Sequence, residues 1–176
     1  MERQVSLSQA RTSFVDSWGK LGLEWGINRA MGQIHALLLS SSRSLDAEEI
    51  MGELSISRGN ANTNLRALMD WGLVSRDYRP GMRREFFSAE KDVWRMARLI
   101  AERRRRKELD PLLTLLESLA KIEPSRGEDP AEVRQFQRTI RDIQGFGQKA
   151  SRILDLLQRL DENAFIARLM SLLKAS

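Results

Sequence analysis

The chain has 176 residues, of which 29 are Lys or Arg and 24 are Asp or Glu, so its formal net charge is +5. A net positive charge of this kind favours polyanionic partners such as nucleic acid. The absence of cysteine excludes disulfides, thiolate catalysis, thiol-based redox sensing and cysteine-ligated zinc. No apolar run approaches the roughly 18 residues that span a bilayer, and the N-terminus lacks a signal-peptide pattern, so we expect a cytoplasmic protein without a membrane partner.

Residues 1–27 are predicted to form a helical arm that takes part in dimerisation. Apolar Phe14, Val15 and Trp18 share one side of its helical pattern. The next helix begins at Asn28, whose side chain suits an N-cap. Its single glycine, Gly32, indicates a close helix crossing. His35, the only histidine of the chain, lies among apolar neighbours and is interpreted as a packed side chain rather than as a ligand or base.

Residues 28–89 are the predicted DNA-binding domain, in which the helix from Asn28 is followed by two short helical patterns and a predicted β-hairpin. The first of these two short helices starts with a capping box, in which Asp46 caps the free amides and Glu49 reaches back. Ser57 suits the N-cap of the second helix. In that helix Ala61, Leu65 and Leu68 recur at helical spacing and share one face. Gly72 then supplies the left-handed residue that commonly ends a helix.

A β-hairpin is predicted directly after the second helix. Its strands cover residues 73–78 and 84–88, and a Pro-Gly pair after Arg79 suits the centre of a type II turn. The polar linker 40–44 is expected to add a short third strand. Helix, turn, helix and hairpin together predict a winged helix-turn-helix, and the fold class is therefore mainly α with a small β-wing.

The exposed side chains of this unit have the chemistry of a DNA-binding surface. Amide, hydroxyl and guanidinium groups of the second helix match the edges of adenine and guanine in the major groove. Long cations of the hairpin suit phosphates or the minor groove. The residues predicted to contact DNA are Ser57, Arg58, Gly59, Asn60, Asn62, Thr63, Asn64 and Arg66 on the helix, and Arg79, Arg83 and Arg84 on the wing.

Several stretches also resemble a known family. They are Trp18-Gly19, the helix from Asn28 to Leu39, Ser57-Arg58-Gly59-Asn60, Asn64-Leu65-Arg66 and Asp70-Trp71-Gly72-Leu73-Val74. Over residues 10–120 the chain is similar to the GbsR-type branch of the MarR-like transcriptional regulators. The resemblance implies a dimeric winged-helix repressor from a bacterium or archaeon.

Residues 90–176 are predicted to be a helical region for dimerisation and effector binding. A long helix starts near Glu90 and carries five consecutive cations, Arg103 to Lys107, which are expected to pair in part with neighbouring acids or to add phosphate contacts. The helix is expected to kink or restart at Pro111, with Asp110 as the cap. After a linker at 123–128 another helix begins, and Gly145-Phe146-Gly147 is expected to break it. Two further amphipathic segments are expected beyond that point, one between Ile153 and Leu160 and one between Phe165 and Leu173.

The expected partners follow from these features. One recognition helix contacts only a few base pairs, so specific binding usually needs two copies of it. The apolar faces of the helices on either side of the winged domain also predict a homodimer, which would bind a double-stranded DNA operator. Trp18, Trp25 and Trp94 are the candidate walls of a small-molecule effector site. Two alternatives remain: a winged helix that binds proteins instead of DNA, and an enzyme. No catalytic residues, cofactor or metal ligands are evident, so we expect a non-enzyme.

Overall fold

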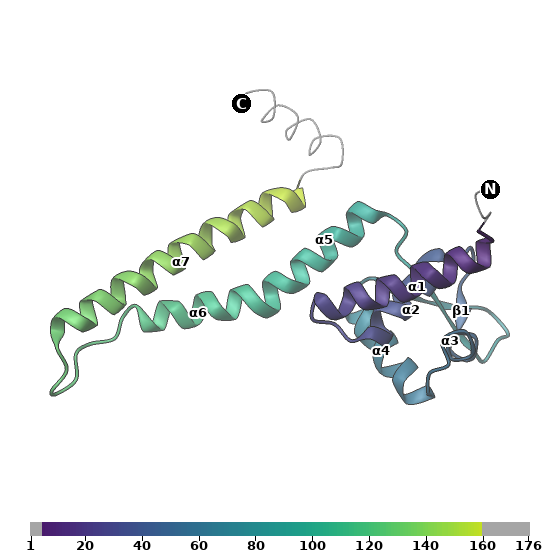
Figure 1. Cartoon of the computed structure of the whole chain (residues 1–176), viewed down its shortest axis with the longest axis horizontal. Coiled ribbons are helices and arrows are strands. Elements are labelled where there is room, and N and C mark those ends of the chain that lie inside the picture. The colour runs from purple at the N-terminus through teal and green to yellow at the C-terminus, as the bar shows by residue number, and fades with distance from the viewer. Residues whose placement is uncertain (1–4, 160–176) are drawn as a thin grey trace, which may run out of the picture. The chain divides into compact units, whose positions relative to one another are not determined.

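The computed structural model describes residues 5–159, and the chain divides between Met96 and Ala97 into two compact units (Figure 1). The first unit holds four helices and a small sheet. Its helices are α1 (Leu7–Glu24), α2 (Arg29–Ser40), α3 (Ala47–Leu54) and α4 (Arg58–Asp70), and its strands are β1 (Leu45–Asp46), β2 (Val74–Tyr78) and β3 (Glu85–Ala89).

The remaining elements are helical. Helix α5 (Val93–Arg104) spans the division and continues through a π-helical turn, η1 (Arg105–Leu109), into α6 (Asp110–Leu119), and α7 (Pro130–Arg159) follows after a linker. Within the part of the chain that is described, no helix combines the length and apolar character that crossing a membrane needs. The predicted final segment between Phe165 and Leu173 lies outside the described residues.

The sheet of the first unit is antiparallel, with strand order β1-β3-β2. Tyr78 pairs with Glu85 at the turn end of the β2–β3 hairpin, and Leu45 of β1 pairs with Phe87. The turn is closed by a hydrogen bond from Met82 N–H to the Arg79 carbonyl at 3.1 Å, with Gly81 at φ +78°. A positive φ at the third turn residue is the feature that type II turns require, so the Pro-Gly prediction is confirmed.

Helices α1 and α2 cross at two glycines. A Cβ added to Gly32 would lie 3.0 Å from Gly19 Cα and 3.1 Å from the Trp18 carbonyl oxygen. Because both neighbours are backbone atoms, a side chain at this position would separate the helices. The close crossing expected at Gly32 is therefore confirmed. It places Trp18 beside His35, and the indole N–H of Trp18 donates to His35 Nδ1 at 3.3 Å.

Helices α2, α3 and α4 and the sheet enclose the core of the first unit. The largest side chains with almost no exposure are Ile34, Leu38, Ile50, Leu65 and Leu68. The helix caps form as expected: Asp46 and Glu49 make a reciprocal capping box, and the Asn28 and Ser57 side chains accept from backbone amides of α2 and α4. This core holds α4 by one face and leaves the other face exposed.

Lys91 closes the C-terminus of α2 from a distant part of the chain. Its Nζ donates to the carbonyls of Leu38, Leu39 and Ser41 at 2.7, 2.6 and 2.8 Å. These carbonyls lie at the negative end of the helix dipole, where a cation is favourable. Burial lowers the pKa of the Lys91 ammonium from its usual value.

We expect Lys91→Met to lower the free energy of unfolding by about 1–2 kcal/mol, because the substitution keeps the stem but removes three charge-assisted hydrogen bonds. Urea denaturation measures this loss. Lys20→Met is the matched control: Lys20 makes an exposed pair with Asp16 four residues away, which is worth at most about 0.5 kcal/mol. Equal losses for the two variants would contradict the capping role.

The helical path from α5 to α6 agrees only in part with the expectation at Pro111. The expected restart is present, because α6 begins at Asp110 after the wider turn η1, but the expected cap is wrong: Asp110 has helical φ and ψ of −61° and −44° and does not cap the helix. Proline lacks an N–H and its ring crowds the preceding turn, and one wider turn accommodates both. In the cation run, Arg106 pairs with Glu102, Arg104 with Glu108 and Arg105 with Asp155.

Helix α7 runs unbroken through Gly145-Phe146-Gly147, so the break expected there is wrong. The helix lies antiparallel beside α6 (Figure 1). A Cβ on Gly147 would lie 2.8 Å from Leu113 Cδ2. Gly147 thus marks a close approach of α6 to α7 rather than a helix end.

Candidate nucleic-acid interface

Helices α3 and α4 are joined by a tight turn at Ser55–Ser57. Ser55 has the left-handed conformation, with φ 52° and ψ 43°, and ends α3. Ser57 Oγ then accepts from the Asn60 N–H at 3.3 Å and starts α4. The turn therefore fixes the direction in which the N-terminus of α4 leaves the core.

Helix α4 presents a polar face to solvent. Arg58, Asn60, Asn62, Thr63 and Arg66 are exposed, as are Ser57 and Gly59. No atom would lie within 4 Å of a Cβ on Gly59, so the backbone there is open to close approach. Among residues 5–159 the Arg66 guanidinium has no hydrogen-bond or ion-pair partner. Free amide, hydroxyl and guanidinium groups on an exposed helix match the donors and acceptors of base edges.

Asn64 does not belong to this exposed face, and its prediction as a DNA contact is corrected by the structure. Its side chain is 3% exposed. Asn64 Oδ1 accepts from Asn28 Nδ2 at 2.7 Å, and Asn64 Nδ2 donates to the Asn60 carbonyl at 2.9 Å and to Asn60 Oδ1 at 2.5 Å. The residue ties the N-cap of α2 to α4, and its amide groups are engaged within the protein.

The three wing arginines have different surroundings. Arg83 is exposed, and its side chain makes no hydrogen bond or ion pair within the described residues. Arg79 lies over the Phe86 ring, 4.0 Å from its centre, and donates to Ser44 Oγ at 2.7 Å. Arg84 pairs with Asp46 at 3.0 Å. In the described part of the chain Arg83 is thus a free cation at the hairpin, while Arg79 and Arg84 also hold the wing to the linker and to α3.

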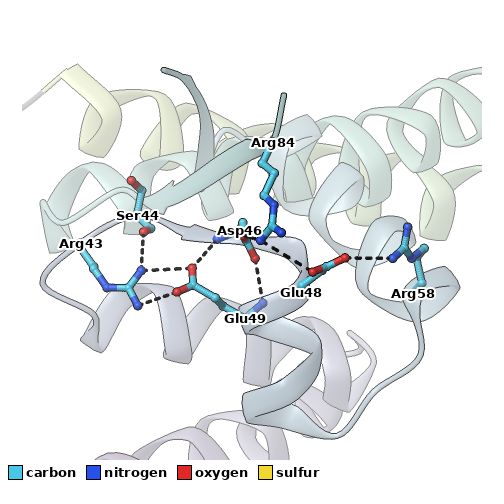
Figure 2. Close-up of polar contacts among 7 residues, drawn as sticks. All are labelled: Arg43, Ser44, Asp46, Glu48, Glu49, Arg58 and Arg84. Carbon is cyan, nitrogen blue, oxygen red and sulfur yellow. Dashed lines mark hydrogen bonds and ion pairs between the residues drawn. The ribbon is translucent and has the colours of Figure 1, made fainter. Parts of the chain in front are cut away.

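Sequence reasoning missed two acidic residues of this surface, Asp46 and Glu48. The sequence pattern assigns Asp46 to the cap of the helix, and both residues to the acids that the dipole favours at a helix start, and it predicts no contact with an arginine. In Figure 2 Asp46 contacts Arg84, and Glu48 lies between Arg84 and Arg58 and contacts both. The Glu49 N–H and, to a lesser degree, the Arg84 guanidinium lower the pKa of the Asp46 carboxyl.

A cavity of about 190 Å³ lies between the start of α3, the start of α4 and strand β3. Glu48, Arg58, Asn62 and Arg84 line it together with five other residues. Helix α4 and strand β3 therefore line one hollow that has both cations and acids on its walls. Within residues 5–159 no cluster of three or more His, Asp or Glu side chains is placed to hold a metal ion.

The candidate effector tryptophans lie at separate places in the chain. Trp18 is half-buried on α1 against Phe14 and His35, with ring centres 5.4 and 6.2 Å away. Trp25 is 54% exposed at the end of α1. Trp94 is half-buried in the first turn of α5. An effector site at these residues stays a prediction.

The elements around α4 define a winged helix-turn-helix domain: α3 and α4 joined by a short turn, followed by the β2–β3 hairpin and completed by β1. A sequence comparison agrees with this class. The chain is 26% identical over 91 residues to the HTH-type transcriptional repressor GbsR of Bacillus subtilis (strain 168), a match that covers 52% of this chain and 50% of that protein. The resemblance to the GbsR-type branch of the MarR-like regulators, expected from the sequence, is confirmed.

The chain spans about half the length of that curated relative. No family model matches this chain. Among solved structures, the crystal structure of a transcriptional regulator matches with a TM-score of 0.60 and 22% identity, covering 86% of this chain and 99% of the other. A MarR-family transcriptional regulator from Rhodococcus sp. RHA1 matches with a TM-score of 0.39 and 17% identity over 78% of this chain and 89% of the other, too slight a likeness to bear on the fold. The predicted fold class, mainly helical with a small β-wing, is confirmed, and these relatives are regulators rather than enzymes, as expected.

Proposed function

We propose that the chain is a sequence-specific, double-stranded DNA-binding transcriptional repressor that acts in the cytoplasm as a homodimer. Helix α4 enters the major groove and the wing lies on phosphates or in the minor groove. The observation that carries the proposal is the exposed polar face of α4, which includes Arg66, unpaired among the described residues, and stands beside an arginine-bearing hairpin. The match to the GbsR repressor supports the same function.

The homodimer is supported by the apolar surface of the second unit. Helices α6 and α7 pack on each other through Leu116, Val133 and Ile140, which are buried. Exposed apolar side chains remain on the same two helices: Leu112, Leu115, Phe136, Ile143 and Phe146. A second copy would cover this surface and hold two α4 helices at a fixed separation, with half-sites about 10 base pairs apart or a small multiple of that.

A salt-titrated binding assay tests the proposal. The protein is measured against duplex from upstream of its own gene and against random duplex of equal length, from about 50 to 200 mM salt. We expect tighter binding to the upstream duplex and an affinity for both that falls steeply with salt. Equal, salt-insensitive affinities would reject the function and favour a winged helix that binds proteins instead.

Arg66 and Arg83 are expected to contribute in different ways. Arg66→Ala should cost about 1–3 kcal/mol on the specific duplex and relax the preference at one base position, because a guanidinium on α4 reads a base edge. Arg83→Ala should weaken specific and random duplex alike and reduce the salt slope by about one, because a cation at the hairpin contacts phosphate. Fluorescence anisotropy on both duplexes measures these effects. Identical behaviour of the two variants would contradict the assigned roles.

A further inference from the structure

One carboxylate, that of Glu48, is shared by the recognition helix and the wing. Its Oε1 lies 3.3 Å from Arg58 Nη2 on α4, and its Oε2 lies 3.7 Å from Arg84 Nη1 at the turn end of the hairpin. Figure 2 shows Glu48 between these two arginines. Arg58 and Arg84 are both on the surface assigned to DNA, so an acidic group occupies a place where a phosphate would be attracted.

A phosphate can replace Glu48 in its ion pairs with the two arginines. The side chains of Glu48, Arg58 and Arg84 are 59%, 70% and 65% exposed. Ion pairs at such exposure are weak and screened by salt, so a phosphate oxygen can replace the carboxylate. Two carboxylates, Asp46 and Glu48, face the two arginines, so the site gains a net positive charge only when Glu48 is displaced.

The neighbouring Asp46 differs from Glu48 in this respect. Its side chain is only 8% exposed. One oxygen accepts from the Glu49 N–H at 2.9 Å, and the other accepts from Arg84 at 3.0 Å. Asp46 is thus part of the α3 cap and keeps Arg84 in place whether or not Glu48 moves. Arg58 has no second acid among its hydrogen bonds and ion pairs within residues 5–159, so release of Glu48 frees Arg58 above all.

We propose that Glu48 is an internal counter-charge that sets the sequence-independent affinity of the α4–wing surface for duplex DNA. A phosphate must displace Glu48 from Arg58 before it gains the full contact, which weakens binding to every sequence. Phosphate contacts carry no sequence information, so this loss falls on the part of the affinity that does not discriminate. The inference rests on the proposed function, since it assigns Arg58 to the DNA-binding surface.

Glu48→Gln tests the inference on random duplex, which needs no knowledge of the operator. At about 100 mM salt we expect the variant to bind random duplex roughly three- to tenfold more tightly than the wild type, with a salt slope steeper by up to about one. Glu53→Gln is the matched control, because it removes the same charge from an exposed position at the other end of α3, about 140° around the helix axis. It should change the affinity less than about twofold.

A second comparison shows whether Glu48 acts through Arg58. In an Arg58→Ala background the gain from Glu48→Gln should fall below about twofold, because the cation that the carboxylate neutralises is gone. A persistent gain in that background, or equal gains for the Gln variants at positions 48 and 53, would overturn the inference and leave only a net-charge effect. Thermal unfolding of each variant confirms that the fold is kept.

The failures of the inference and of the proposed function are distinguishable. If the wild type binds random duplex with a steep salt dependence while Glu48→Gln binds no more tightly, the counter-charge role is wrong and DNA binding stands. If the wild type shows no salt-dependent binding to any duplex, the proposed function is wrong and the inference falls with it.

Discussion

Asn64→Asp is expected to lower the free energy of unfolding by about 3–5 kcal/mol at pH 7, although the two side chains have nearly the same shape. Asn64 Nδ2 donates to the Asn60 carbonyl and to Asn60 Oδ1. An aspartate oxygen in that place would face two acceptors at 2.9 and 2.5 Å instead of donating to them. The new charge would also lie at a position that is 3% exposed.

The orientation of the Asn64 amide is determined by backbone groups at both ends of its hydrogen-bond chain. The Met31 N–H donates to Asn28 Oδ1, which turns Asn28 Nδ2 toward Asn64 Oδ1. At the other end the Asn60 carbonyl can only accept, so it requires the Asn64 amino group. Because neither end can reverse its polarity, the carboxylate cannot be accommodated by flipping a side chain.

Urea denaturation of Asn64→Asp and of the control Asn62→Asp measures this effect. Asn62 is exposed on the same helix, so its replacement by aspartate should cost less than about 0.5 kcal/mol in stability while it weakens DNA binding through repulsion of phosphate. Burial should raise the pKa of the carboxyl introduced by Asn64→Asp, so the stability loss of this variant relative to the wild type should shrink as the pH falls. Equal stability of the two aspartate variants would contradict the buried role of Asn64.

The burial of Asn64 could have been predicted from the helical spacing of α4. The spacing that assigned Ala61, Leu65 and Leu68 to the core face of α4 also assigns Asn64 to it, since residue 64 lies three after 61 and four before 68. The prediction places Asn64 on the exposed face because its amide side chain is polar. The partner that makes its burial favourable, Asn28, lies 36 residues earlier and is not indicated by any local pattern.

Elements set by local interactions could be predicted from the sequence. The capping box at Asp46, the cap at Ser57 and the turn before Met82 all depend on residues within three or four positions of one another. The roles of Glu48 and Lys91 could not be predicted, because their partners come from distant segments. The break predicted at Gly145 and Gly147 is wrong for a related reason. Low helix propensity alone suggests a break there, whereas Gly147 is needed for the close contact with Leu113 on another helix.

Between pH 7 and pH 5, His35 is expected to dominate the pH dependence of stability. The imidazole is 4% exposed, and burial, assisted by the nearby Lys91 charge, lowers its pKa from 6.5 to about 4. Its Nδ1 accepts from the Trp18 indole N–H, which protonation of that nitrogen would prevent. The unfolded chain therefore takes up a proton below about pH 6.5 that the folded chain does not take up until about pH 4.

The free energy of unfolding should consequently be highest above pH 6.5 and fall by about 1.4 kcal/mol per pH unit below it, a loss of about 2 kcal/mol at pH 5. His35 is the only histidine of the chain, and the perturbed carboxyls of Asp16, Asp46, Glu49 and Glu117 have lowered pKa values and titrate at lower pH. His35→Gln, which keeps an acceptor for Trp18, should make the stability nearly independent of pH over this range. NMR titration of the wild-type imidazole provides a test that needs no variant, and a folded-state pKa near 6.5 would contradict the expected loss.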